Sequence, residues 1–252
     1  MKSFLAARYV ILSFATLIVG WQFAFFLGDF NEALFPSPGR TAAAFWEICR
    51  DGSIFTHLDA SLRRFVVGYA SGVVIGTTCG LLMGWFSDVY KYVNPTVQLL
   101  RPISPTAWAP FIALWFGIGD VPAIVVVFIA AFFPMFLSTV AAVDGIEPIY
   151  LKAAQNFGIR EPQILWKIAF PAALPRIATG ARLALGSAWI FLVAGEMMGA
   201  QSGLGFLVID ARNNLRLDIL LAAIATIGLT GLALDSAIKV VEKRLLKARG
   251  TK

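Results

Sequence analysis

Long apolar runs with few or no charged residues recur along this chain and are separated by shorter polar segments. A run of about 20 such residues is long enough to cross a bilayer as a helix. The pattern predicts membrane-spanning helices at residues 9–28, 65–86, 92–116, 121–143, 177–199 and 219–238. We therefore expect an all-α, polytopic membrane protein with about six transmembrane helices, forming a single domain over residues 1–252.

Two of these predicted spans have unusual residue patterns. Within 65–86, glycine recurs at every fourth position, at Gly68, Gly72, Gly76, Gly80 and Gly84. A helix face without side chains lets another helix approach closely, so a packing seam is expected there. Within 92–116 the prolines are Pro95, Pro102, Pro105 and Pro110. Proline removes a helical hydrogen bond, so this span is expected to be interrupted.

The polar segment at residues 144–176 is the longest interruption in the second half of the chain, and its pattern predicts order. Pro148 suits the first turn of a short helix, and Gly158 suits the position just past its end. Pro162 suits the start of a second helix, which Pro171 is expected to end. Apolar residues gather on one side of each predicted helix. Two amphipathic helices joined by a glycine bend indicate a docking element.

Basic residues are distributed unevenly between the two sides of the predicted topology. With both termini in the cytoplasm, 14 lysines and arginines lie inside and 6 outside, and Arg182 stays within a span. Basic residues accumulate on the cytoplasmic side, so this orientation is favoured and places residues 144–176 in the cytoplasm. Arg63 and Arg64 fall on the outer side without an explanation. The first span lacks a signal-peptide cleavage pattern and is expected to be retained.

Composition agrees with a membrane protein and excludes several classes of function. The chain is 58% hydrophobic and 14% charged, whereas soluble domains carry about 25% charged residues. The net charge of +6 forms no continuous basic face, so nucleic-acid binding is not expected. Cys49, Cys79 and the single histidine, His57, predict neither a disulfide nor a metal site. No nucleophile elbow or phosphate-binding loop is present, so neither catalysis nor a cofactor is expected on this chain.

Residues 152–171 resemble the cytoplasmic signature of bacterial ABC importer permeases, which is Glu-Ala-Ala, three residues, Gly, nine residues, Ile, one residue, Leu-Pro. The corresponding positions, in the same spacing, are Lys152, Ala153, Ala154, Gly158, Ile168, Phe170 and Pro171. Lys152 replaces the glutamate and Phe170 the leucine. Residues 101–120, 170–199 and 202–211 further resemble the branch of these permeases that imports nitrate, sulfonates, taurine or bicarbonate.

This resemblance implies an inner-membrane subunit of a type I ABC importer in a bacterium. Two copies of the chain would form the translocation path for a small, anionic solute. Cytoplasmic ATP-binding subunits, which carry the ATP and Mg²⁺, would receive the coupling residues, and a periplasmic or lipid-anchored binding protein would deliver the solute. The residues expected to couple to the ATPase are Lys152, Ala153, Ala154, Gly158, Ile168 and Pro171.

Four residues are candidates for contact with the solute, because charged or amphipathic side chains within spans are functional hypotheses by default. They are Arg101, Trp108, Arg182 and Glu196. Arg101 has a second interpretation, as a side chain that reaches the cytoplasmic surface from the start of its span. Either arginine also has a structural interpretation, in which it pairs with Glu196 or a backbone carbonyl. Asp235 is expected to pair with a cytoplasmic lysine or arginine.

An ion-coupled secondary transporter that acts without an ATPase is the alternative function. Such proteins usually contain inverted repeats and several buried carboxylates. The chain contains no visible repeat, and Glu196 is the acidic residue placed well inside a predicted span. The permease hypothesis is therefore favoured.

Overall fold

The computed structural model of the protein describes residues 2–28, 31–32 and 34–248 and, over these residues, contains helices and no strands. The first elements are α1 (Lys2–Leu27), α2 (Pro38–Arg50), α3 (Ser53–Trp85), α4 (Ser87–Leu100), η1 (Pro105–Trp108) and α5 (Ala109–Phe116). The remaining elements are α6 (Asp120–Asp144), α7 (Pro148–Asn156), α8 (Glu161–Ile164), η2 (Leu165–Ala169), α9 (Phe170–Gly199), α10 (Leu204–Asn213) and α11 (Leu217–Ala248).

Four helical runs in the described part of the chain are long and apolar enough to cross a membrane. They are Ser53–Trp85, Asp120–Asp144, Leu165–Gly199 and Leu217–Arg244, and a shorter apolar run, Leu12–Leu27, lies in α1. The stretch at residues 92–116 is interrupted, as its prolines predict. α4 ends at Leu100, and η1 and α5 follow after a non-helical break.

The glycine seam predicted along α3 is confirmed, and α6 is the helix that packs on it. A Cβ built on Gly72 would lie 2.7 Å from the Cβ of Ala131 and 2.9 Å from the carbonyl oxygen of Phe128. A Cβ on Gly80 would lie 2.6 Å from the Cβ of Thr139. These distances leave no room for a side chain, so glycine is required where the two backbones meet.

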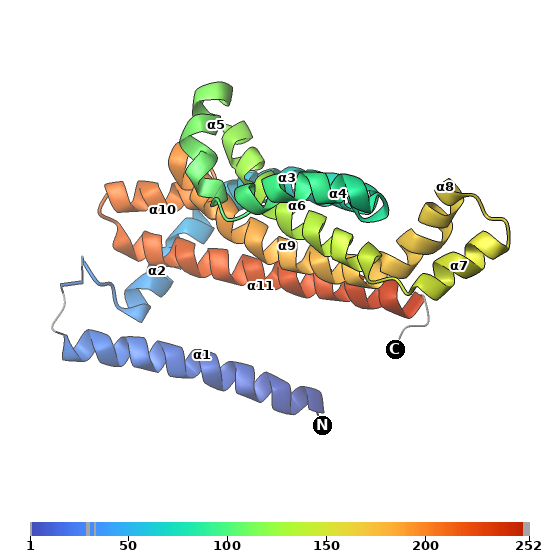
Figure 1. Ribbon diagram of the computed structural model, residues 1–252. Helices are drawn as coiled ribbons and strands as arrows, with labels where there is room; N and C mark the ends of the chain where they lie inside the picture. The colour runs from blue at the N-terminus through green and yellow to red at the C-terminus, as the bar shows by residue number, and fades with distance from the viewer. Residues whose placement is uncertain (1, 29–30, 33, 249–252) are drawn as a thin grey trace.

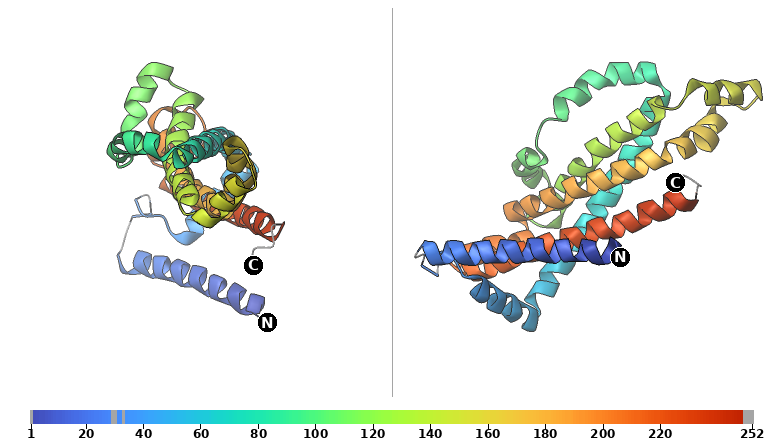
Figure 2. Two further views of the ribbon diagram at one scale, coloured as in Figure 1. Left: turned by 45° about the vertical axis from the view of Figure 1, so that its right-hand side comes forward. Right: turned by 90° about the horizontal axis from the view of Figure 1, so that it is seen from below.

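The helices α3, α6 and α9 form the centre of the bundle (Figure 1). α2 and α10 lie at one end, and α7 and α8 project from the opposite end. α11 runs beside α9, whereas α1 lies at the side of the bundle, away from its centre (Figure 2). The two ends, called below the α2–α10 end and the α7–α8 end, carry the polar features described next.

Candidate functional site

The predicted docking element forms two short helices around a glycine bend at the α7–α8 end of the molecule. Gly158 has a φ of 72°, which L-residues with a Cβ rarely adopt. Its N–H donates to the carbonyl of Gln155 at 2.9 Å, and the N–H of Ile159 donates to Ala154 at 3.2 Å. These bonds satisfy the last carbonyls of α7 and reverse the chain toward α8.

The second helix of this element does not end at Pro171, contrary to the sequence expectation. Leu165–Ala169 forms a π-helical turn, in which the N–H of Phe170 donates to the carbonyl of Leu165, and α9 follows directly. A proline ring would clash with the carbonyl four residues earlier in a regular α-helix. The wider π-turn lies where that clash would occur, so the helix runs on through Pro171.

The six predicted coupling residues divide into an exposed and a packed group. Lys152, Ala153 and Gly158 are exposed. Ala154 is buried, whereas Ile168 and Pro171 are half-buried, on the side where Ile164 and Ala169 are fully buried. The packed group thus joins the element to the bundle, while the exposed group faces away from it.

Large apolar side chains are exposed on the same element. Phe157 is 85% exposed, and Ile149, Tyr150 and Trp166 are also exposed. These four residues lie on α7, at its end and in the π-turn, outside the long apolar part of the bundle. Exposed apolar residues of this kind occur at surfaces that contact a protein partner or a membrane.

Arg101 and Trp108, two of the candidates for solute contact, flank the break between α4 and η1. Arg101 caps the C-terminal end of α4 and borders a cavity of about 520 Å³ between residues 101–105, α6 and α9. Trp108 does not line this cavity; it packs near Val126 of α6 and Phe191 of α9. The structure therefore places Arg101, but not Trp108, at this cavity.

Arg182 lies on α9 and pairs with Asp235 of α11 at 2.9 Å. Lys239 contacts the other oxygen of the same carboxylate at 2.6 Å. The pairing of Asp235 with basic residues agrees with the sequence expectation. Arg182 therefore already has a counter-charge and does not pair with Glu196, and its neighbour in the sequence, Leu183, lines the cavity beside Arg101.

Glu196, the fourth candidate, is buried near the α2–α10 end and pairs with an arginine that sequence reasoning did not explain. Its side chain is 0% exposed and accepts a hydrogen bond from Arg64 at 2.8 Å. Arg64 also pairs with Asp120 at 2.6 Å and donates to the carbonyl of Ser202. One guanidinium thus connects α3, α6, α9 and the segment before α10.

Further hydrogen bonds attach the segment before α10 to this buried pair. The hydroxyl of Ser61 donates to Glu196 at 2.8 Å and accepts from the N–H of Leu204 at 2.8 Å. The N–H of Gly205 donates to Glu196 at 2.9 Å, and the N–H of Gly203 donates to Nδ1 of His57 at 3.1 Å. A sequence signal was present, because Arg64 lies four residues before Gly68 and therefore on the same packed face of α3.

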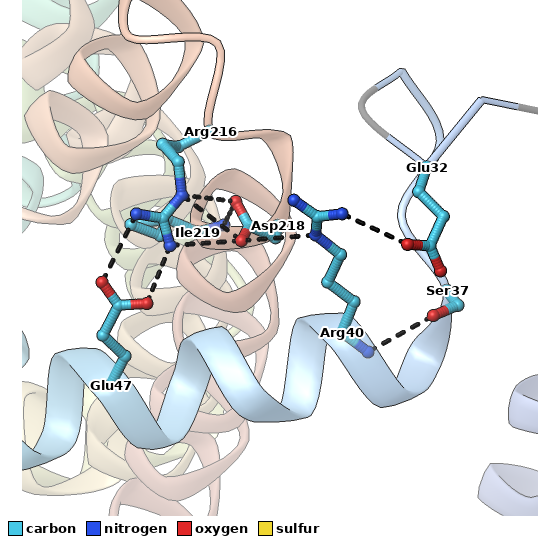
Figure 3. A network of polar contacts seen from close by, with 7 residues as sticks. All are labelled: Glu32, Ser37, Arg40, Glu47, Arg216, Asp218 and Ile219. Carbon is cyan, nitrogen blue, oxygen red and sulfur yellow. Dashed lines mark hydrogen bonds and ion pairs between the residues drawn. The ribbon is translucent and has the colours of Figure 1, made fainter.

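A second network at the same end connects α2 to the start of α11, as Figure 3 shows. Arg216 pairs with Glu47 at 2.8 Å and with Asp218 at 3.0 Å, and Arg40 lies 3.8 Å from Asp218 and 3.2 Å from Glu32. The Glu47 and Asp218 carboxylates raise the pKa of the Arg216 guanidinium above its ordinary value. These contacts are partly exposed and fix α2 on the bundle.

Metal ligands are not grouped in the part of the chain that the structure describes, where no three His, Cys, Asp or Glu residues lie together. The site features of the molecule are therefore the exposed apolar element at the α7–α8 end, the cavity beside Arg101, and the buried polar network at the α2–α10 end.

Comparison with known proteins identifies the family to which the chain is similar. The chain matches the family described as binding-protein-dependent transport system inner membrane component over residues 72–247. SsuC of Bacillus subtilis (strain 168), a permease protein whose name refers to aliphatic sulfonates transport, is 33% identical over 94% of this chain and 86% of SsuC. The taurine transport system permease protein TauC of Escherichia coli (strain K12) is 33% identical over 97% of this chain and 92% of TauC.

A solved structure shares the fold. A chain of the MetNI methionine ABC transporter, in an inward-facing conformation, superimposes with a TM-score of 0.64 at 22% identity. The match covers 76% of this chain and 94% of that chain. This similarity extends to the helical architecture of a transporter membrane subunit.

Proposed function

The chain belongs to the family of binding-protein-dependent transport system inner membrane components, and we propose that it imports a small anion of the sulfonate class. It is the integral inner-membrane permease of an ABC importer, a transporter class in which an ATPase and a binding protein act with the permease. ATP hydrolysis belongs to a separate subunit in this proposal. The solute class is supported by the names of SsuC and TauC, which refer to sulfonate compounds.

The exposed apolar element at the α7–α8 end is the observation that carries the coupling part of this proposal. Ile149, Tyr150, Phe157 and Trp166 would be covered by the ATPase subunit. The short Ala153 side chain, exposed beside them, permits close approach of a partner. Lys152 presents a positive charge where the family signature has a negative one, so its ionic contact on the ATPase would be an acidic residue.

The orientation follows from the same element. An ATPase contact requires the α7–α8 end to face the cytoplasm, as the distribution of basic residues also predicts. The first turn of α1 and the last turns of α11 lie toward this end (Figure 1). Both termini are therefore proposed to be cytoplasmic, and the α2–α10 end, which would receive the binding protein, faces outward.

A second copy of the chain is proposed to complete the translocation path. The cavity beside Arg101 opens at the surface of the chain, and the second copy is proposed to lie against this opening. The ion-coupled alternative receives no support from Glu196 or Asp235. Glu196 and Asp235 are each paired with arginine, which leaves neither free to carry a proton or cation.

Copurification with ATPase activity tests the proposal. A tagged wild-type chain is expected to elute from solubilised membranes with a subunit that hydrolyses ATP, and the Phe157→Ser variant is expected to lose it. Trp46→Ser removes an exposed aromatic residue at the opposite end and is the matched control, since Trp46 is 70% exposed. Equal ATPase recovery from all three chains, or transport of labelled taurine by the isolated chain, would contradict the proposal.

A further inference from the structure

The cavity at the break between α4 and η1 has the size and lining of a small-molecule site. Its volume is about 520 Å³, within the range of ligand pockets. Residues 101–105, α6 and α9 form its wall, and most of the lining is apolar. The polar side chains on the wall are Arg101, Ser104, Ser138 and Ser187. They come from three separate segments and converge on one space.

Arg101 differs from the three paired arginines described above, and it shares with exposed Arg176, which lies against Gly145, the lack of a carboxylate partner among the described residues. Arg64, Arg182 and Arg216 each contact a carboxylate within ion-pair distance. The Arg101 side chain has no hydrogen-bond or ion-pair partner among the described residues. No described acidic residue lines the 520 Å³ cavity, although Arg101 also borders a second, smaller cavity that Asp144 lines. Arg101 is exposed, so a solute can reach it. A guanidinium without a counter-charge beside an apolar wall favours a bound anion.

The two serines on the long helices are also without partners. A hydroxyl on a helix often donates to the carbonyl four residues earlier, as Thr139 and Thr226 do in this protein. Ser138 and Ser187 make no hydrogen bond with any described residue. Ser138 packs against Gly180 of α9. A Cβ built on Gly180 would lie 2.6 Å from the Ser138 Cβ, so only glycine leaves room for Ser138 at this contact. Both serines thus line the cavity, and neither hydroxyl has a partner among the described residues.

We infer that this cavity is a sulfonate-binding subsite of the translocation path. Arg101 pairs with the anionic head group, and the Ser138 and Ser187 hydroxyls donate to its oxygens, whereas Phe133 and Phe191 contact the alkyl part. Arg182 does not contribute, because Asp235 already neutralises it. The inference rests on the proposed transport function for its ligand class, and it singles out Arg101 from the two arginines that the sequence offers.

Charge-selective cysteine labelling tests the subsite without ATP-driven uptake. Ser187→Cys is introduced into a chain in which Cys49 and Cys79 are replaced by serine, in membranes that contain the full complex. Rates of modification are measured with an anionic and a cationic methanethiosulfonate reagent of similar size. Arg101→Gln removes the proposed counter-charge, Arg101→Lys retains it, and Arg212→Gln, on exposed α10 surface, is the matched charge control.

The anionic-to-cationic rate ratio at Ser187→Cys is expected to fall about tenfold with Arg101→Gln, because a nearby unit charge raises the local concentration of one reagent and lowers that of the other by about threefold each. Arg101→Lys and Arg212→Gln are expected to leave most of the ratio intact. Taurine and methanesulfonate are expected to slow the labelling of Ser187→Cys in the chain that keeps Arg101. They are expected not to slow it in the chain that also carries Arg101→Gln.

Three results would overturn the inference: an unreactive Ser187→Cys thiol, a ratio that Arg101→Gln leaves unchanged, or an equal effect of Arg212→Gln. The proposed function fails differently, through loss of ATPase copurification. A charge-selective cavity in a chain that binds no ATPase would retain this subsite and refute the importer coupling. ATPase copurification without charge selectivity would do the reverse.

Discussion

The replacement of Glu196 by alanine is expected to lower stability more than any surface change at the same end of the molecule. The Arg64 and Glu196 side chains are 4% and 0% exposed, and their atoms lie 2.8 Å apart. Without the carboxylate, the Arg64 guanidinium keeps only Asp120 as a counter-charge, and the N–H of Gly205 loses its acceptor. Removing one partner of a buried pair costs about 3–5 kcal/mol.

Thermal unfolding of the detergent-solubilised chain, followed by the loss of its monodisperse gel-filtration peak, measures this cost. For a chain of this length each kcal/mol lowers the Tm by about 2–4 °C, so a decrease of about 6–20 °C is expected. The neighbouring Arg63 provides a matched control, because its side chain is 78% exposed and pairs only with exposed Asp59. Arg63→Met is expected to change the Tm by less than about 2 °C.

A double variant separates the charge effect from the loss of packing. Arg64→Met combined with Glu196→Leu removes both charges and leaves Asp120, which is 67% exposed, in contact with water. Its Tm is expected to lie above that of Glu196→Ala, because no buried charge is left unpaired. A Glu196→Ala Tm close to that of Arg63→Met, or a double variant less stable than Glu196→Ala, would refute the reasoning.

Three further predictions concern the other features. Gly72→Ala is expected to destabilise the chain by about 1–3 kcal/mol in the same unfolding assay, since the new Cβ would lie 2.7 Å from the Cβ of Ala131 on α6. Gly228→Ala is the control and is expected to be neutral or stabilising, because no atom lies within 4 Å of a Cβ at that position. Gly158→Val is expected to leave the chain in the membrane and to reduce taurine uptake per ATP hydrolysed, because a β-branched residue is strained at φ 72°; a normal uptake ratio would contradict this. Arg182→Gln is expected to retain taurine uptake, and a loss of uptake with intact ATPase activity would place Arg182 in the path.

Local patterns predict the elements of this fold because their causes are local. The glycines of α3 every fourth residue predict a seam, and Gly158 after a Pro148 start predicts a bend, since each depends on a few neighbouring residues. The continuation through Pro171 was not predictable in this way. It depends on the π-turn at Leu165–Ala169, whose hydrogen-bond shift no residue type specifies.

The partners of the charged residues were also not predictable from local sequence, because they lie far away along the chain. Glu196 and Arg182 were recognisable as charges within spans, but their partners, Arg64 and Asp235, lie 132 and 53 residues away along the chain. Arg101, by contrast, is recognisable from sequence as a charge beside prolines, and its lack of a partner emerges only when every other charge has been placed. Sequence therefore identifies candidates, whereas packing decides which of them remain available for a ligand.

The uninterrupted connection between the α7–α8 element and α9 has a mechanical consequence. The helical run Leu165–Gly199 contains 35 residues, so it forms a rod about 50 Å long. Ser187 lies along this rod at the cavity, and Glu196 lies near its far tip, locked to Arg64. Because α8 continues into this run without a loop, a displacement of α8 would tilt the whole rod. Ser187 at the cavity and Glu196 at the other end of the rod would then move together. The buried Arg64–Glu196 pair would oppose this movement, because it holds that end of α9 to α3.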